Sequence, residues 1–408
     1  MRCKLQFFAN KCSSGNRLNI SVKPLIRKYK LKTFSKIGSI RKLDWDRCNQ
    51  NGNLFTSYNF LKLLEDSNSL SDRTGWNPYY FTWDTENNLQ ACVAAYEKVN
   101  SQGEFVFDHS WANVYQKLGL SYYPKLLIAS PFTPITGKRI LLRKENNIEF
   151  KKKIIDDIIE FSIKKKFSSL HINFIDEEQI KFYSDNNFII RYGEQFHFVN
   201  NGYLSFQDFL DKLSYKKRKA IIKERNSIKK MGIKIEILKG NNIQSDILEE
   251  LYKFYITTID KKWSYDYLTI DFFLNLKRYL KDNLVIIIAL QGKKVIAAAL
   301  NFISNNILYG RYWGTKKELP YLHFEVCYYK AIETAIDLNL SKVEAGAQGP
   351  HKIKRGYTPA LTYSAHLVFN KELHEIFSRY NELEKENILN NIRILKEEYS
   401  PYKVISET

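Results

Sequence analysis

The sequence predicts an α/β protein in which two domains of similar layout follow one another along the chain. The chain has 408 residues, which is long for one hydrophobic core, and 44% of them are apolar, which is enough for two packed domains. Both halves alternate short apolar runs of strand length with amphipathic stretches of helical period. We therefore expect one domain over 36–195 and a second over 196–398, between a basic extension over 1–35 and a tail over 399–408.

In the first half, turn residues and apolar periodicity divide the chain into short elements. The turn-rich residues 84–88 indicate a strand pair, and Pro131 and Pro134 enforce an extended loop. The elements expected there are a helical stretch over 44–65, strands over 79–83 and 90–98, a helix over 110–118, strands over 126–129 and 139–142, a helix over 148–166, a strand over 169–174, a short helix from Asp176 and a strand near 188–191.

The second half repeats this layout. The apolar run 284–290 has strand length, and the turn 291–294 after it is a hairpin signal. The expected elements are a helical region over 206–231, a strand over 233–238, helices over 244–260 and 269–281, a β-meander over 284–290, 295–303 and 307–313, a helix over 323–338, a strand over 342–346, a strand over 362–369 and a helix over 371–398. From the meander onward this is the order of a GNAT-type acyltransferase fold, an analogy that fixes no chemistry.

Cysteine spacing, hydropathy and motif content argue against several classes of protein. The five cysteines show neither a pairing framework nor CxxC spacing, which argues against a disulfide scaffold and a zinc site. No stretch approaches the roughly 20 apolar residues that a membrane helix needs. Without a Walker loop or a GxGxxG motif, NTPase and dinucleotide-binding functions lose support. We expect a soluble protein with reduced thiols and no metal.

The net charge of +19 is concentrated at the N-terminus. Residues 1–43 hold 12 Lys or Arg and no Asp or Glu, so the rest of the chain has 51 basic against 44 acidic residues, a net charge of +7. An acid-free, serine-containing segment without an apolar h-region resembles an organelle transit peptide, and a disordered basic arm is the alternative. The sequence thus leaves the cytoplasm and an organelle, either mitochondrion or plastid, as alternative locations.

Most of the candidate chemistry lies in the stretch 307–357. A strand through its first residues places Tyr309, Arg311 and Trp313 on one face, because side chains alternate along a strand. An arginine between two aromatic residues on one strand face indicates a cleft or an ion pair. We therefore expect this face to line the site.

Two further features follow in the same stretch. Glu325 falls at the edge of the apolar stripe of the helix predicted over 323–338. A glycine-bracketed loop over 346–349 carries the amide of Gln348 and leads into His351 and Lys352. Loops with this mixture of groups tend to hold ligands.

Nine ordered blocks stand out along the chain: GWNP (75–78), SQGEFVFD (101–108), YYPKL (122–126), PFTP (131–134), QFH (195–197), KRK (217–219), LYGRYWG (308–314), HFE (323–325), and EAGAQG (344–349) followed by His351 and Lys352. Together they resemble the FemAB-like branch of the GNAT superfamily, whose members are described as peptidoglycan biosynthesis or recognition proteins. The resemblance covers about residues 36–398. So many blocks in order make it specific for the family.

The resemblance implies two tandem GNAT-like acyl-CoA N-acyltransferase domains, the second carrying the main site. It also implies transfer of an acyl or aminoacyl group to an amine acceptor, since better-understood relatives transfer an aminoacyl group from charged tRNA to an amine of a peptidoglycan precursor. The donor expected is therefore acyl-CoA or aminoacyl-tRNA. Two alternatives remain: a non-catalytic GNAT-fold module that binds peptide, glycan or RNA, and a small-molecule N-acyltransferase.

Acyl transfer to an amine needs a general base, groups that stabilise the oxyanion, and contacts that bind the donor. The candidate catalytic residues are His351, Glu325 and His323 as bases, Gln348 and Tyr309 at the oxyanion, and Arg311 and Glu344 as charged groups. A structural interpretation accompanies each base: a backbone-bonded loop histidine at 351, a helix cap at 323, and an ion pair of Glu325 with Arg311 that includes Glu344.

Other residues are candidates for substrate contact. They are Trp313, Lys352, Arg355, Glu104, Tyr123, Lys125, Thr133 and His197. The four first-domain residues among them could line an acceptor groove, whereas Phe105, Phe107 and Phe132 are expected in the core. The helix over 206–231 has nine basic residues between Lys212 and Lys230. Among these, Lys217, Arg218 and Lys219 are candidates for RNA or phosphate contact, with a solvated helix face as the alternative.

Overall fold

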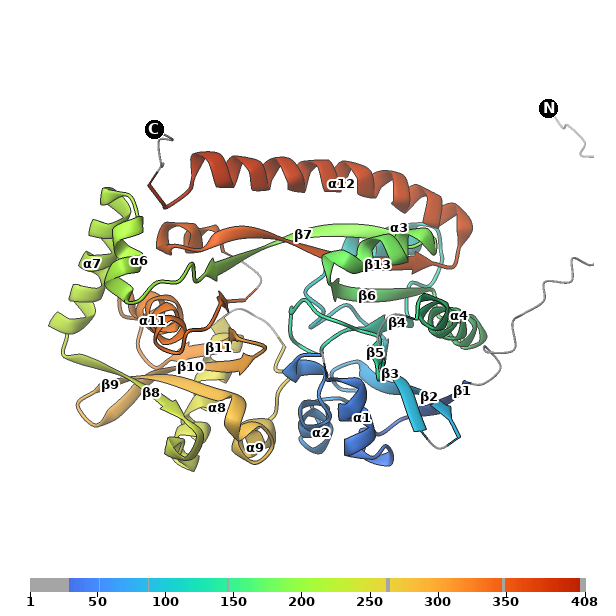
Figure 1. Ribbon diagram of the computed structural model, residues 1–408, viewed down its shortest axis with the longest axis horizontal. Coiled ribbons are helices and arrows are strands. Elements are labelled where there is room, and N and C mark those ends of the chain that lie inside the picture. The colour runs from blue at the N-terminus through green and yellow to red at the C-terminus, as the bar shows by residue number, and fades with distance from the viewer. Residues whose placement is uncertain are drawn as a thin grey trace, which may run out of the picture.

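One mixed β-sheet organises the molecule. The computed structural model describes residues 29–50, 52–86, 88–144, 147–261, 265–346 and 349–403, and within these residues the sheet has 13 strands (Figure 1). Helices from both halves pack around it. The α/β class predicted from the sequence is confirmed.

The first half contributes an antiparallel run of strands that ends in a parallel pair. Its strands are β1 (Lys30–Phe34), β2 (Trp76–Thr85), β3 (Asn88–Lys98), β4 (Lys125–Ile128), β5 (Leu141–Leu142) and β6 (Ser169–Ile175). Neighbours β1 to β4 are antiparallel, β5 pairs with β3, and β4 pairs with β6 in parallel. A parallel pair needs a crossover, and here it contains α4 (Ile148–Lys164), whose N-cap Asn147 accepts a hydrogen bond from the Phe150 amide.

The second half repeats this pairing. Its strands are β8 (Ile233–Lys239), β9 (Leu284–Gln291), β10 (Lys294–Ser304), β11 (Ile307–Thr315) and β12 (Lys342–Glu344). Neighbours β8 to β11 are antiparallel and β11 pairs with β12 in parallel. The apolar run in β9 is continuous because residues 284–289 are all buried. Helices α8 (Ser245–Lys261) and α9 (Ile270–Leu280) pack beside these strands.

The last strand of each half pairs with the other half. β7 (Ile189–Val199) ends the first half but pairs with β12, and β13 (Thr358–Val368) belongs to the second half but pairs with β6. β7 and β13 also pair with each other. The strand order is therefore β1-β2-β3-β4-β6-β13-β7-β12-β11-β10-β9-β8. The domain boundary at 195/196 remains a prediction, and it falls inside β7.

The C-terminal helix packs against the two exchanged strands, β7 and β13. α12 (Lys371–Glu398) lies along β7 and β13 (Figure 1). Its Phe377 ring stacks on Trp111 of α3 (His109–Lys117), with 4.5 Å between ring centroids. The segment after α12 then returns to the second half, where the Tyr402 hydroxyl donates to the Gly356 carbonyl oxygen over 2.7 Å.

Three predicted helices are interrupted. The stretch 44–65 forms α1 (Lys42–Cys48) and α2 (Tyr58–Asp66), separated by a 3-10 turn that Asn53 caps. The region 206–231 forms α6 (Phe206–Lys212) and α7 (Tyr215–Lys230), because Leu213 bridges to Tyr402 in the C-terminal segment. The helix predicted over 323–338 is divided into α10 (Leu322–Phe324), a π-helical turn (Glu325–Tyr329) and α11 (Lys330–Asp337).

The expected burial of the aromatic residues near 101–134 is correct in part. Phe132 is buried. Phe105 is half-buried, in a left-handed backbone conformation with φ of 61°. Phe107 is 59% exposed, so its assignment to the core was wrong. It lies in a loop whose neighbour Asp108 is buried and pairs with Lys125, so the polar side chain takes the interior position and Phe107 is left outside.

We expect the two halves to unfold in one transition, because neither can leave the sheet without breaking the β7 and β13 ladders of the other. In a urea titration, tryptophan fluorescence should coincide with far-ultraviolet circular dichroism, since most tryptophans are in the first half whereas helices and strands occur in both. Two separated transitions would contradict this expectation.

Candidate active site

The candidate site lies where the parallel strands β11 and β12 stop pairing. β12 pairs with β11 only as far as Tyr309, whereas β11 continues to Thr315. The chain after β12 leaves the sheet and continues in the 3-10 helix η8 (Pro350–Arg355). Ligands of α/β folds bind at the carboxyl ends of parallel strands, where strands diverge. The predicted site residues of β11 and η8 belong to the two diverging branches.

Three predicted residues occupy adjacent positions across three strands. Tyr309 of β11 lies opposite Glu344 of β12, which lies opposite His197 of β7. All three side chains are buried. Burial lowers the pKa of His197 to about 4; the Glu344 carboxylate opposes this shift, and nearby lysine and arginine side chains add to it. The His197 imidazole is therefore neutral at pH 7.

Gln195 connects this row of residues to the first half. Its amide nitrogen donates to the Pro134 carbonyl oxygen over 2.8 Å, so its amide oxygen is left to accept from His197 Nε2 at 3.0 Å. Thr133, next to Pro134, lines the same pocket as Arg311 of the second half. Residues that the sequence assigned to separate domains thus meet here.

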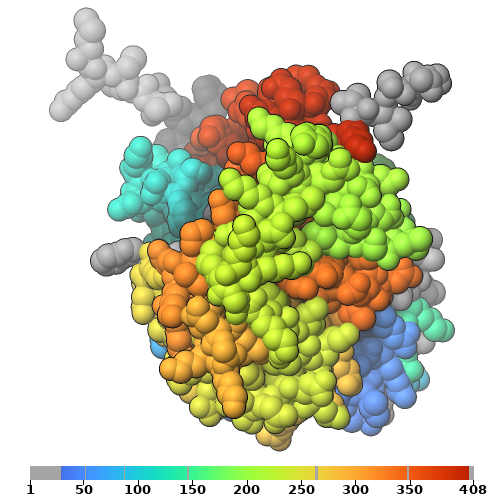
Figure 2. Space-filling view, turned by 90° about the vertical axis from the view of Figure 1, so that its left-hand side faces the viewer, coloured from blue at the N-terminus to red at the C-terminus, as the bar shows by residue number. Residues whose placement is uncertain are grey.

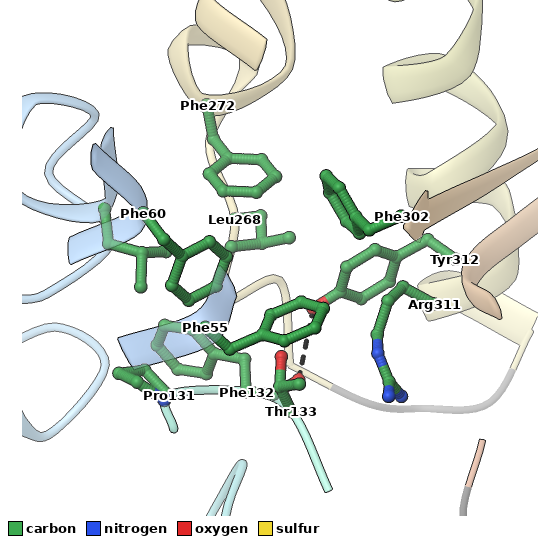
Figure 3. A pocket seen from close by; sticks show the side chains of 11 residues that line it. Phe55, Phe60, Pro131, Phe132, Thr133, Leu268, Phe272, Phe302, Arg311 and Tyr312 are labelled. Atoms are coloured by element: carbon green, nitrogen blue, oxygen red, sulfur yellow. Dashed lines mark hydrogen bonds between the residues drawn. The ribbon is translucent and has the colours of Figure 1, made fainter. Parts of the chain in front are cut away.

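The aromatic pocket, as we call it, lies between the halves (Figure 3). Its polar lining is Thr133, Arg311 and Tyr312, and its apolar lining is Phe55, Phe60, Leu64, Pro131, Phe132, Leu268, Phe272 and Phe302. Tyr312 closes one side by donating from its hydroxyl to the Phe132 carbonyl oxygen at 3.3 Å. The cavity that these side chains enclose measures about 10 Å³, which is room for about one water molecule, so the lining is close-packed.

The two predicted histidine bases lie near each other. The ring centroids of His351 and His323 are 6.3 Å apart, and His323 lies 4.9 Å from Trp313. His351 is exposed, and its Nε2 is 2.8 Å from the Tyr328 hydroxyl. Partial burial, with Lys352 and Arg355 nearby, lowers the pKa of His351, so its imidazole is neutral at pH 7. His351 thus combines a neutral imidazole with access to solvent.

Glu325 forms an ion pair, but with a different partner from the one the sequence suggested. Arg225 of α7 donates from Nε and Nη2 to the Glu325 carboxylate at 3.0–3.2 Å, and from Nη2 to Glu333 at 2.7 Å. The Arg225 guanidinium also lies over the Phe206 ring at 4.4 Å. Arg311 is not among the partners of Glu325. Both carboxylate oxygens are thus engaged in joining α7 to the π-helical turn.

Arg355 and Lys352 are also engaged. Arg355 Nη2 lies 3.0 Å from Glu224 of α7, and its Nη1 donates to the His351 carbonyl oxygen at 2.9 Å. The guanidinium stacks over Phe324 at 3.3 Å. Lys352 is buried and donates to the Gly346 carbonyl oxygen at 2.8 Å. These contacts fix the backbone on both sides of His351.

The three basic candidates on α7 have different environments. Arg218 pairs with Asp211 at 3.0 Å. Lys219 is exposed, and its Nζ lies 5.9 Å from the centre of the Tyr215 ring. Lys217 has a lowered pKa, because partial burial and the neighbouring cations Lys354 and Lys216 disfavour its charge. Lys354 belongs to η8, so the positive surface of α7 reaches the segment that carries His351.

In the first half, the candidates for an acceptor groove lie mostly in the interior. Lys125 has no exposed side-chain surface, and its ammonium pairs with Glu104 at 2.9 Å and with Asp108. Burial raises the pKa of Glu104 to about 7. Tyr123 is half-buried and shares a 2.7 Å hydrogen bond with Ser101. Glu104 and Lys125 therefore do not line an open groove.

Some functional features escaped the sequence analysis, and some lie outside the described residues. Arg225 and Tyr328 were missed because a basic run and an apolar helical stripe do not reveal which member turns toward the site. Gln195 stood in a recognised block, and its polar side chain in an apolar strand was the available signal. Gln348 lies outside the described residues, as do residues 1–28 of the basic extension.

Within the described ranges, no group of three or more His, Cys, Asp or Glu side chains could hold a metal ion.

A search of the same residues for a helix long and apolar enough to cross a membrane finds none.

Comparison with known proteins gives a family and a fold. A family model named FemAB-like, described as peptidoglycan biosynthesis/recognition, matches residues 36–404. Among solved structures, FemX is similar over 85% of this chain and 100% of its own, at 11% identity and a TM-score of 0.52. The C-terminal domain of a putative lysylphosphatidylglycerol synthetase from Agrobacterium fabrum is similar over 83% of this chain and 95% of its own, at 9% identity and a TM-score of 0.52. At such identities the likeness shows the fold alone.

A tandem GNAT protein from the clavulanic acid biosynthesis pathway is also similar, over 83% of this chain and 98% of its own, at 7% identity and a TM-score of 0.41. No curated protein matches the sequence.

Replacing Glu325 by Ala should lower the free energy of unfolding by ~3 kcal/mol, the low end for a broken buried pair, because Arg225 keeps Glu333 as a partner. Urea unfolding measures the change. The control is Glu382→Ala, which removes an exposed pair with Lys385 and should leave the midpoint unchanged. A stable Glu325→Ala protein would show that the pair does not hold α7 in place.

Proposed function

The chain belongs to the FemAB-like family of peptidoglycan biosynthesis/recognition, and from that premise we propose that it is an N-acyltransferase that moves an aminoacyl group onto an amine acceptor. The observation that carries the proposal is the setting of His351. Its neutral imidazole is exposed beside His323 and Trp313, where β11 and η8 diverge. An amine must lose a proton to attack a carbonyl carbon, and a neutral imidazole accepts it.

The proposed step uses one nitrogen of His351. If Nε2–H donates to the Tyr328 oxygen, the lone pair of Nδ1 is left to accept a proton. Gly349 leaves this edge of the ring uncovered, because a Cβ there would lie 2.9 Å from Nδ1 and 2.4 Å from Cε1. The amine nitrogen bonds to the carbonyl carbon of the donor, its proton passes to Nδ1, and the ester bond breaks. The alkoxide oxygen that leaves takes the proton from Nδ1, which restores the neutral imidazole and yields an amide and a hydroxyl group.

We propose aminoacyl-tRNA rather than acyl-CoA as the donor. The basic residues of α7 support this choice. The helix lies on the face of the molecule that Figure 2 shows, and its Lys217 lies near Lys354, three residues from His351. Residues 315–320, which join β11 to the next helix, contain no glycine to form a pyrophosphate loop. An RNA backbone bound along α7 would lie near the segment that carries His351.

His351→Gln should lower kcat/KM for aminoacyl transfer by about 100-fold or more, the usual contribution of a general base. The wild-type rate should fall as the pH drops below the pKa of His351, which is lower than 6.5, because protonation removes the accepting lone pair. The variant should lack this acid limb. His109→Gln, at an exposed histidine of the first half, is the matched control. A His351→Gln enzyme with the wild-type pH profile would exclude His351 as the base.

Replacing Lys216, Lys217 and Lys219 together by Glu should weaken binding of charged tRNA and reduce its salt dependence, with the slope of log K against log salt falling by about 1 for each lost phosphate contact. A matched triple exchange at Lys152, Lys164 and Lys181 of the first half should leave binding unchanged. Equal loss in both variants would indicate only a response to net charge. Tight binding of an acyl-CoA by the wild type, unaffected by the α7 exchange, would favour the small-molecule acyltransferase.

A further inference from the structure

Two buried histidines face each other where β13 of the second half pairs with β6 of the first, a pairing that we call the first seam. His366 lies directly opposite His171 in this antiparallel ladder, and each residue is 1% exposed. Their Nδ1 atoms are 2.6 Å apart. On the outer sides, His171 Nε2 lies 2.7 Å from the Ser169 hydroxyl oxygen, and His366 Nε2 lies 2.7 Å from that of Ser364. The four side chains thus form one hydrogen-bonded chain across the first seam.

The contact between the two Nδ1 atoms requires one donor and one acceptor. A neutral imidazole carries a single N–H, so one Nδ1 atom donates and the other must be bare. When both rings are charged, all four ring nitrogens carry a proton and two N–H groups point at each other. The hydrogen bond between β6 and β13 is then replaced by repulsion between two cations.

Hydroxyl groups and an aromatic ring surround the pair. Trp111 of α3 covers it, with ring centroids 5.4 Å from His366 and 6.1 Å from His171. The Tyr122 hydroxyl lies 3.4 Å from His171 Nε2 and donates to the Asp108 carboxylate at 2.5 Å. Among the described residues, no carboxylate lies within hydrogen-bonding distance of either ring. A charged imidazole pair would therefore lack an anionic partner.

The charged groups around the pair disfavour its protonation. Lys125 of β4 and Arg191 of β7 are the cations that face the rings, Asp108 is the carboxylate, and Glu384 of α12 pairs with Arg191 at 3.1 Å. Burial lowers the pKa of both histidines well below the ordinary value of 6.5, the cations add to this shift, and Asp108 opposes it. Both rings are therefore neutral at pH 7.

The equivalent pairing at the other end of the exchange, which we call the second seam, has a different charge arrangement. There β7 of the first half pairs with β12 of the second, and His197 lies opposite Glu344. This carboxylate opposes the lowering of the His197 pKa, so it favours the charged imidazole. Two cations are thus brought together only at the first seam when the described histidines of the two seams take up protons.

We propose that the His171–His366 pair makes the first seam acid-sensitive: when both rings are protonated, β13 separates from β6 while the second seam stays closed. At neutral pH the first seam is closed, in keeping with the single unfolding transition expected there. β13 follows η8, which carries His351, so the device acts on the strand next to the candidate site.

Hydrogen exchange followed by mass spectrometry measures the opening. Rings released by opening regain a pKa near 6.5, so below that pH each favours the open seam by about tenfold per pH unit, or up to about 100-fold for the pair. After correction for the intrinsic exchange rate, the protection of β6 and β13 should fall in this way toward about pH 5 and stay constant above pH 6.5. Strands β9 and β10 should keep their protection. Constant protection of β6 and β13, or an equal loss in β9 and β10, would overturn the inference.

His366→Gln tests the pair itself. The glutamine amide can donate to His171 Nδ1 or accept from it, so a hydrogen bond across the seam survives protonation of His171. The loss of protection per pH unit should become at least about tenfold smaller, since one titrating ring is gone. His109→Gln, at an exposed histidine, should keep the wild-type dependence. Wild-type behaviour of His366→Gln would show that the pair is not the sensor.

The wild-type protein provides a second measurement in case His366→Gln does not fold. In nitrogen NMR of the histidine rings at pH 7, the Nδ1 atoms of His171 and His366 should together carry one proton. Two protonated or two bare Nδ1 atoms would contradict the shared hydrogen bond, and the inference would fail. Neither experiment uses an acyl donor or an acceptor, so the results are independent of the proposed function.

Discussion

The exchange of strands β7 and β13 is the constraint on which the rest of the structure depends. Each half builds an antiparallel run that ends in a parallel pair, and each then gives its last strand to the other half. Residues of β7 therefore face both halves. Gln195 illustrates the effect, because one side-chain amide holds the Pro134 loop of the first half and orients His197 beside the strands of the second. The site between the halves exists because this ladder is shared.

Ion pairs between α7 and its neighbours hold the segment that carries His351 in place. Arg225 and Glu224 are adjacent on α7, yet one binds the π-helical turn at Glu325 and the other binds η8 at Arg355. Because Arg355 also donates to the His351 carbonyl oxygen, the position of that histidine depends on α7. The helix thus has two roles: its inner residues are structural, while exposed lysines such as Lys216 and Lys219 remain on its outer surface.

Buried charge is handled in two ways. In the first half Lys125 is surrounded by Glu104, Asp108 and Ser101, so its charge is compensated within the fold. At the junction Arg311 is half-buried between the rings of Phe55 and Tyr309, and its Nε has no hydrogen-bond partner. A cation without an anionic partner adds no stability to the fold. The ion pairs of the polar cluster in the first half are therefore complete within the fold, whereas Arg311 at the junction has no ion-pair partner among the described residues.

The sequence by itself determined the element order, the α/β class and the family. These follow from local patterns, such as the apolar run of β9 and the ordered blocks, which need no knowledge of distant contacts. It also placed Tyr309, Arg311, Glu344 and His197 among the candidates, and strand register brings three of them side by side. Only the tertiary structure decided which charges pair, because partners such as Arg225 and Glu325 lie 100 positions apart. It alone placed β13 beside β6 of the first half, and it left Arg311 without an ion-pair partner among the described residues, since long-range pairing depends on packing that periodicity does not encode.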